Sequence, residues 1–295
     1  MRIDLHTHSV QSDGTDTPTE LVARAAAQGL DVIALTDHDH SEGWPDAAAA
    51  ARQHGLGFVP GMEISTVHGG RSVHLLGYLF DPTYEPLAAQ LRRTIEGRAD
   101  RLVDWVRRST QLGIPIDRDL ILSKASGSAA ISKNHLADAL IEAGFVPDRD
   151  TAFNTLFAPG QPFHSRRHAI ELTDAIELVT KAGGVCVIAH PWARSSRNAL
   201  DSTTFEELQG LGLTGLEVDH QGHDPATRTA LREIAARLDL VVTGSSDYHG
   251  TNKTDHELGC NTTSRVDFER LLARADAAST ASGRRTPKLV APPQG

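Results

Sequence analysis

The 295-residue sequence has little of what defines several common protein classes. Only two cysteines, Cys186 and Cys260, are present, which excludes a disulfide framework and is typical of a cytoplasmic protein with reduced thiols. The apolar runs are far shorter than the about 20 residues that a membrane span needs. Charged and polar residues begin at Arg2, Asp4 and His6, which leaves no room for the apolar region of a secretory signal. We therefore expect a cytoplasmic protein that does not associate with membranes.

Aromatic residues and positive charge are also scarce. Aromatic side chains make up 5% of the sequence, so the core that its 39% hydrophobic residues can build must be mainly aliphatic. There are 29 Lys and Arg against 38 Asp and Glu, a net charge of −9, which argues against a broad nucleic-acid surface and against a DNA duplex as partner. Residues 83–170 contain 12 basic and 10 acidic residues and therefore have a net charge of +2. The remainder of the chain has a net charge of −11.

Short apolar runs typical of buried strands recur along the chain, at 2–6, 31–36, 57–62, 72–78, 185–190, 213–219 and 240–246. Helix signals fall between many of them. Thr17, Pro18 and Glu20 form a capping box with proline at the first helical position, and Asp224-Pro225 opens a second helix. This alternation predicts an α/β fold with a parallel sheet, either a barrel or a doubly wound sheet.

The alternation stops between residues 83 and 170, where apolar residues follow a helical spacing. We expect a mostly helical insertion there, between two stretches, 1–82 and 171–278, that together form the α/β domain. The Ser-, Pro- and Gly-rich segment 279–295 has little to bury and is predicted to be a flexible tail.

The sequence contains 15 histidines, against three tyrosines and two methionines. Many of them stand with carboxylates at or near the ends of the expected strands. The carboxyl ends of parallel strands share one rim, so we expect these side chains to converge there. Each motif alone is weak evidence, but the convergence from six strands indicates metal binding. The predicted ligands are His6, His8, Asp13, His38, Glu63, His74, His190, Asp247 and His249.

Nine nitrogen and oxygen ligands without a thiolate are typical of catalytic ions, not of a structural zinc site. They are too many for one ion and would serve two or three, with carboxylates as bridges. Such a cluster is an arrangement for hydrolysis. Three divalent ions would also leave the site positive, in spite of the acidic body, which favours a phosphate substrate.

Six segments in this order and spacing resemble the PHP (polymerase and histidinol phosphatase) superfamily: DLHTHSVQSDGTDTPTEL, ALTDHDH, PGMEIS, HLLGY, AHP and SSDYHG. The sequence looks most like the stand-alone branch of small metal-dependent phosphoesterases, which includes nucleotide phosphatases and a 5′→3′ exoribonuclease. The resemblance covers about residues 1–80 and 170–260. It implies an α/β fold of a distorted (β/α)₇, TIM-like barrel with a trinuclear metal site. Residues 1–82 and 171–278 would form this metal-binding barrel, and the insertion 83–170 would cap the substrate site.

The resemblance also implies how the three ions are held. His6, His8, Glu63 and Asp247 would hold one, Asp13, His38 and His249 the second, and Glu63, His74 and His190 the third, so that Glu63 bridges two ions. Mn²⁺ is the expected metal, with Zn²⁺ or Fe²⁺ as alternatives, because this ligand set accepts all three.

Substrate residues are expected mainly in the insertion. Arg98 and Arg101 lie three apart on one helix face, and Lys133, Asn134 and His135 stand where the family branch often has Arg-Pro-His. Further residues are expected to orient ligands or a substrate or to serve the leaving group (Asp37, Asp39 and His220), and His38 is expected to contact substrate besides its metal.

The leading hypothesis is a metal-dependent phosphatase that uses a metal-bridging hydroxide to hydrolyse phosphate monoesters of nucleotides, namely 3′,5′-bisphosphonucleotides and 5′-monophosphates. Three alternatives stay open: a 5′→3′ exoribonuclease on short RNA, a histidinol-phosphate phosphatase and a non-catalytic scaffold. The scarcity of aromatic residues and the negative net charge argue against the exonuclease, because single-stranded RNA is bound by stacking aromatics and basic residues. The oligomeric state is left open.

Overall fold

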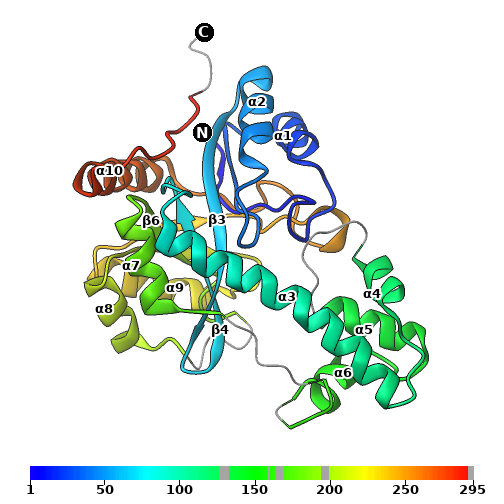
Figure 1. The fold of residues 1–295 in the computed structure, drawn as a ribbon. Helices are drawn as coiled ribbons and strands as arrows, with labels where there is room; N and C mark the ends of the chain where they lie inside the picture. The colour runs from blue at the N-terminus through cyan, green and yellow to red at the C-terminus, as the bar shows by residue number, and fades with distance from the viewer. Residues whose placement is uncertain (126–132, 159, 164–168, 194–198, 292–295) are drawn as a thin grey trace. The chain divides into compact units, whose positions relative to one another are not determined.

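The computed structural model describes residues 1–125, 133–158, 160–163, 169–193 and 199–291 (Figure 1). The chain divides into two compact units. The first comprises residues 1–91 and 169–295 and the second residues 92–168. No helix in the described ranges is long and apolar enough to cross a membrane.

The first unit is built on a sheet whose seven main strands follow the order β1-β2-β3-β4-β6-β7-β8. Their bounds are β1 (Ile3–Asp4), β2 (Val32–Leu35), β3 (Gly57–His68), β4 (Arg71–Tyr78), β6 (Val185–Ala189), β7 (Leu213–Asp219) and β8 (Val241–Gly244). The short β5 (Ile170–Glu171) pairs with β3 off this path.

The two ends of this sheet meet, so that the sheet is nearly closed like a barrel. Thr7, just after β1, forms a parallel bridge with Tyr248, which follows β8. The His8 N–H donates to the Tyr248 carbonyl at 2.9 Å, and the Thr263 N–H donates to the Ile3 carbonyl at 2.9 Å. The predicted barrel-type α/β fold is confirmed.

One strand does not follow the predicted parallel arrangement. β4 is antiparallel to both of its neighbours, β3 and β6, whereas the pairs β1–β2, β2–β3, β6–β7 and β7–β8 are parallel. The reason lies in Gly69 and Gly70, which join β3 to β4 with φ angles of 55° and 75°. Two adjacent residues with positive φ allow a tight hairpin turn, so the chain reverses at once instead of crossing over through a helix.

Alternating side chains of the strands belong to two different cores. In β2, Val32 and Ala34 belong to one cluster and Ile33 and Leu35 to another. The first cluster is formed by side chains from one face of six strands and from α10 (Arg265–Ser282). The second packs the opposite strand face against the other helices of this unit, which include α1 (Pro18–Ala27), α2 (Trp44–His54), α7 (Leu172–Lys181), α8 (Ser202–Gly210) and α9 (Pro225–Arg237). Burial on both faces explains why the strands read as continuous apolar runs.

The C-terminal segment differs from the predicted flexible tail. α10 continues to Ser282, and its Ser279 side chain is buried. Beyond the helix, Val290 and Phe58 exchange two backbone hydrogen bonds of 2.9 Å. The backbone of Val290 therefore pairs with that of β3, an interaction that composition does not reveal. Residues 292–295 of the predicted tail lie outside the described residues.

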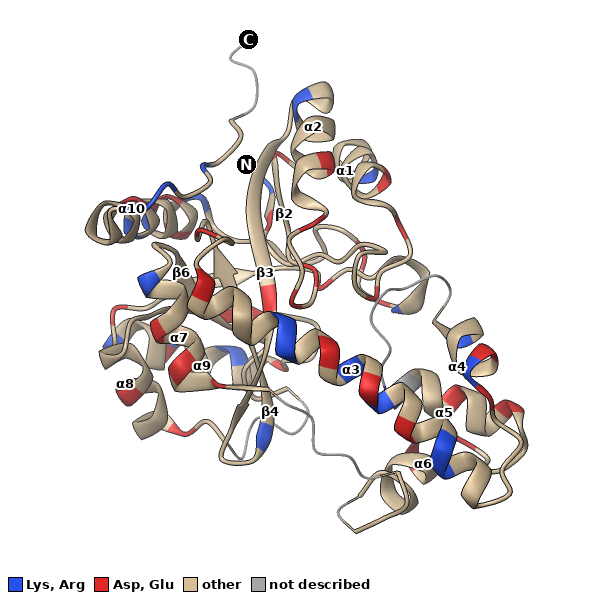
Figure 2. Cartoon of the chain, viewed as in Figure 1, with Lys and Arg blue, Asp and Glu red and all other residues tan. Residues whose placement is uncertain are grey.

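The second unit is helical. α3 (Glu85–Gln111) begins in the first unit and continues into the second, which also contains α4 (Arg118–Lys124), α5 (Lys133–Glu142) and α6 (Arg149–Thr155). Its own core includes Trp105, Ile121, Leu136 and Phe163. Acidic and basic residues follow one another along α3 (Figure 2).

Candidate metal centre

The structure brings the nine predicted ligands together in the first unit. They fall into overlapping groups whose ligand atoms all lie within 4.8 Å of one another. The groups are His6–His8–Asp247, His8–Asp13–His38–His249, His6–Glu63–His190 and His38–Glu63–His74. Seven of the nine come from segments just past the carboxyl ends of strands or from the loops that follow, and Glu63 lies within the long strand β3. His74 is different, because it lies within β4 and its side chain reaches the cluster from an antiparallel strand.

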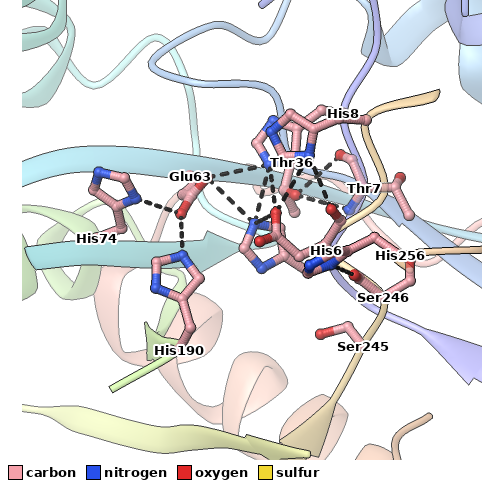
Figure 3. Close-up of polar contacts among 12 residues, drawn as sticks. His6, Thr7, His8, Thr36, Glu63, His74, His190, Ser245, Ser246 and His256 are labelled. Atoms are coloured by element: carbon pink, nitrogen blue, oxygen red, sulfur yellow. Dashed lines mark hydrogen bonds and ion pairs between the residues drawn. The ribbon is translucent and has the colours of Figure 1, made fainter. Parts of the chain in front are cut away.

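Glu63 lies at the centre of the cluster and divides it into two sides (Figure 3). Its Oε1 contacts His74 Nδ1 at 2.7 Å and His190 Nε2 at 3.0 Å. Its Oε2 lies 3.1–3.3 Å from Nε2 atoms on the other side, those of His6, His8 and His38. The Glu63 side chain is 2% exposed. Each oxygen thus faces a different set of imidazoles, which is the arrangement that a bridging carboxylate requires.

The contact between the imidazoles of His6 and His8 tests whether the site fits a metal. His6 Nδ1 donates to Glu217 Oε1 at 3.0 Å, and His8 Nδ1 donates to Ser12 Oγ at 3.2 Å, whose own proton goes to Asp37. When both rings are neutral, their Nε2 atoms therefore carry lone pairs that lie 3.0 Å apart. Two lone pairs at this distance repel unless a proton or a metal ion lies between them or against them. The donor set fits divalent ions.

The protonation states of the cluster fit the same interpretation. Burial lowers the pKa of His38 to about 3 and that of His190 to about 4, so both imidazoles are neutral at pH 7. Burial alone would raise the pKa of Glu63, but the histidines around it hold that pKa well below its usual value. Neutral imidazoles and ionised carboxylates are the forms that bind metal ions.

The cluster as a whole is short of positive charge. Burial disfavours a charged His6, but the carboxylates of Glu217, Glu63 and Asp247 outweigh this and raise the pKa of His6 well above its usual value. A buried group of carboxylates that draws a proton onto a neighbouring imidazole is a group that divalent cations would stabilise.

Two of the ligand residues adopt backbone conformations that are unusual for residues other than glycine. The φ angles are 32° at His190 and 54° at Asp247. Conformations of this kind cost free energy and concentrate at functional sites, where the surrounding contacts fix them. His190 follows β6 directly and Asp247 lies three residues after the end of β8, so both are in turns just past a strand.

The three residues predicted to orient ligands or a substrate are all buried beside the cluster. Asp37 accepts hydrogen bonds from Ser9 N at 2.7 Å and Ser12 Oγ at 2.6 Å. Asp39 accepts one from Ser65 N at 2.7 Å. His220 accepts the Gly222 N–H on Nδ1 at 2.9 Å, so its proton is on Nε2, which donates to Asp247 Oδ2 at 3.1 Å.

Sequence reasoning missed several residues that contact the ligands. Glu217 lies in the middle of an apolar strand, β7, and an isolated acid in such a strand is the one signal that could have found it. His256 is half-buried and donates from Nδ1 to the carbonyl of Ser246, the residue before Asp247, at 2.6 Å (Figure 3). Lys253 forms an ion pair with Asp247 Oδ2. A lone lysine four residues after His249 carries no pattern that sequence analysis could detect.

The predicted substrate residues of the insertion belong to the second unit. Arg101 is 7% exposed and its guanidinium lies 4.8 Å from the centre of the Trp105 ring. His135 is 8% exposed, and Lys133 Nζ lies 5.8 Å from the Phe157 ring centre. Arg98 is half-buried. The side chain of Asn134 lies outside the part of the chain that the structure describes.

The fold and this ligand set define a class of enzyme. Residues 4–143 match the model of the PHP domain. The chain belongs to the PHP family and is a metal-dependent phosphoesterase of the phosphatase type.

Relatives with described activities cover most of the chain. The sequence is 36% identical over 259 residues to a 3′,5′-nucleoside bisphosphate phosphatase of Chromobacterium violaceum, across 87% of this chain and 90% of the relative. It is 33% identical to a 5′-3′ exoribonuclease of Haemophilus influenzae, across 84% of this chain and 90% of the relative. A candidate metal-dependent phosphoesterase from Bifidobacterium adolescentis superposes with a TM-score of 0.82 and 36% identity, across 92% of this chain and 96% of that structure.

Proposed function

We propose that this enzyme hydrolyses phosphate monoesters of small nucleotides, with 3′,5′-bisphosphonucleotides preferred over 5′-monophosphates. The observation that carries the proposal is the Glu63 carboxylate, whose two oxygens face imidazoles on opposite sides, as a carboxylate shared by two metal ions would. The Chromobacterium violaceum relative, named for this activity, supports the substrate class.

The proposed cofactors are three divalent ions, with Mn²⁺ expected first. Their ligands would be the nine residues of the cluster, divided into the three sets given by the family resemblance, with Glu63 shared by two ions. Such ions supply an activated water and neutralise charge on the phosphate. The chain itself contributes fixed imidazole tautomers, set by Glu217 and Ser12, and ionised carboxylates. We further propose a cytoplasmic setting, in which both free cysteines stay reduced.

Cations of the second unit are proposed to hold a phosphate of the substrate. Arg98, Arg101 and Lys133, with His135, would bind the phosphate that does not react. A second bound phosphate supplies binding energy that positions the first, which favours a substrate with two phosphates on one small body.

An exoribonuclease that acts on short RNA is the second candidate, since the Haemophilus influenzae relative bears that name. Single-stranded RNA is bound along a track of cations with stacking aromatics. Several basic residues of the second unit are instead engaged with acids: Arg108 Nε lies 2.6 Å from Asp104 Oδ2, and Arg149 Nη2 lies 2.6 Å from Asp138 Oδ2. This pairing favours the small substrate.

Steady-state kinetics under one Mn²⁺ buffer test the proposal. The substrates are adenosine 3′,5′-bisphosphate, AMP, histidinol phosphate and a short 5′-phosphorylated RNA. We expect the highest kcat/KM for the bisphosphate. A clear preference for RNA would make the enzyme an exonuclease, and a clear preference for histidinol phosphate would assign it to another branch of the family. Absence of phosphate release from every substrate would contradict the proposed function altogether.

A further inference from the structure

The two oxygens of Asp247 face different partners. Oδ1 faces the imidazoles of the cluster, at 3.5 Å from His6 Nε2 and 3.6 Å from His8 Nε2. Oδ2 faces away from them, toward His220 Nε2 at 3.1 Å and the ammonium of Lys253. One carboxylate thus separates the predicted metal position at Oδ1 from a fixed positive charge at Oδ2.

A fourth cation site formed by His220, Asp247 and His256 is also conceivable from their spacing, but the hydrogen bonds argue against it. His220 accepts the Gly222 N–H on Nδ1, so its Nε2 carries a proton and cannot ligate an ion in this arrangement. The Lys253 ammonium already supplies the positive charge beside Asp247 Oδ2.

Lys253 is held in place, unlike an ordinary surface lysine. Its side chain is 19% exposed, whereas that of Lys181 is 59% exposed. The short helix η2 (Gly250–Asn252) precedes Lys253 and is hydrogen-bonded to the loop that contains Asp13. Thr251 N donates to Thr15 Oγ1 at 3.1 Å, and Asn252 Nδ2 donates to the Asp13 carbonyl at 3.0 Å. Lys253 therefore loses less side-chain entropy than an exposed lysine would when its ammonium binds a ligand.

We propose that Lys253 binds the phosphate of the substrate that reacts, as a specificity-determining residue next to Asp247. An ammonium has three N–H donors, so a phosphate can be bound while the contact with Asp247 persists. The two oxygens of a carboxylate are about as far apart as two oxygens of a phosphate. In the proposed arrangement, a phosphate at the Oδ1 side turns a second oxygen toward the ammonium at Oδ2. The inference rests on the proposed function and adds a phosphate contact within the first unit.

Calorimetric titration of Mn²⁺-loaded protein with inorganic phosphate tests the proposal, together with metal content from elemental analysis and KM for AMP. We expect Lys253→Met to weaken phosphate binding and raise KM roughly ten- to a hundredfold, the effect of losing one charge-assisted hydrogen bond, with metal content unchanged. Lys253→Gln keeps an N–H donor for Asp247 without the charge. It should weaken phosphate binding by a similar factor, and it tests the proposal if Lys253→Met folds poorly. Lys181→Met is the matched control and should equal the wild type.

Two results would overturn the inference. Wild-type phosphate affinity in both Lys253 variants would show that the ammonium does not contact phosphate. A loss of metal that accounts for the whole loss of phosphate binding would show that Lys253 serves only as the counter-ion of Asp247. Either result, with wild-type enzyme that still releases phosphate from nucleotides, leaves the proposed function intact. Wild-type protein that releases none from any substrate would contradict the proposed function itself.

Discussion

Glu217 Oε1 lies 3.0 Å from Nδ1 of His6, and both side chains are fully buried. The same carboxylate accepts the His190 backbone N–H at 2.7 Å and the hydroxyl proton of Ser245. Burial would raise the pKa of Glu217, but His6 and the other histidines nearby lower it to about 2, so the group is ionised at neutral pH. One acid of β7 thus fixes segments that follow β1, β6 and β8.

The first prediction concerns this acid. Glu217→Gln keeps the shape, but an amide cannot accept from all three donors, so His6 loses its fixed tautomer or His190 loses its backbone partner. We expect metal affinity to fall about ten- to a hundredfold, the usual cost of removing such a partner. Titration with Mn²⁺ measures this, with the exposed Glu269→Gln as control. Unchanged metal affinity in Glu217→Gln would show that other contacts suffice to orient His6.

The second prediction concerns the predicted bridge, Glu63. Glu63→Gln preserves size but removes the negative charge that faces imidazoles on both sides. We expect the loss of at least one equivalent of metal and nearly all phosphatase activity. Elemental analysis and phosphate release measure the two effects, and Glu177→Gln on the exposed face of α7 serves as control. Full metal occupancy with near-normal turnover would exclude a bridging role.

The third prediction concerns the proposed phosphate residues of the second unit. Arg98→Ala should raise KM for nucleotides while metal content stays constant, because the ligands all lie in the first unit. One charge-assisted hydrogen bond accounts for about 1.5–3 kcal/mol, or roughly ten- to a hundredfold in KM. Arg107→Ala is the matched control, since Arg107 is 56% exposed and pairs with Asp104. Equal kinetics of the two variants would make Arg98 an ordinary surface residue.

The fourth prediction concerns the turn that carries Lys253. Gly250 has φ of 68°, and a Cβ there would lie 1.8 Å from Thr15 Oγ1. Gly283 has φ of 65°, but a Cβ there would meet nothing within 4 Å. Gly283→Ala should therefore lower the free energy of unfolding by the left-handed penalty alone, about 1–2 kcal/mol. Gly250→Ala should lower it further, as chemical denaturation would show. Equal losses would mean that Thr15 moves aside without cost.

Local sequence was sufficient for the parts of this protein that local physics controls. The alternation of apolar runs with capped helices predicted the α/β fold, because buried strands and amphipathic helices have distinct periods. Polar ligands next to apolar strand ends, such as His6 after β1 and Asp247 after β8, predicted the nine residues that the structure brings together. The carboxyl ends of strands converge on one rim by topology, so the position of a residue in its own strand already indicates its neighbours.

Tertiary structure decided what depends on partners far apart in the sequence. The turn at Gly69 and Gly70 is a local feature, but only the register of β3 with β4 shows how His74 reaches Glu63. Glu217 and His6 are 211 residues apart, and a lone acid in an apolar strand does not identify the donor that it meets. Val290 likewise shows its role only through its pairing with Phe58. Motif spacing determined which residues form the cluster, whereas the charges that orient and neutralise it come from long-range packing, which leaves no local pattern in the sequence.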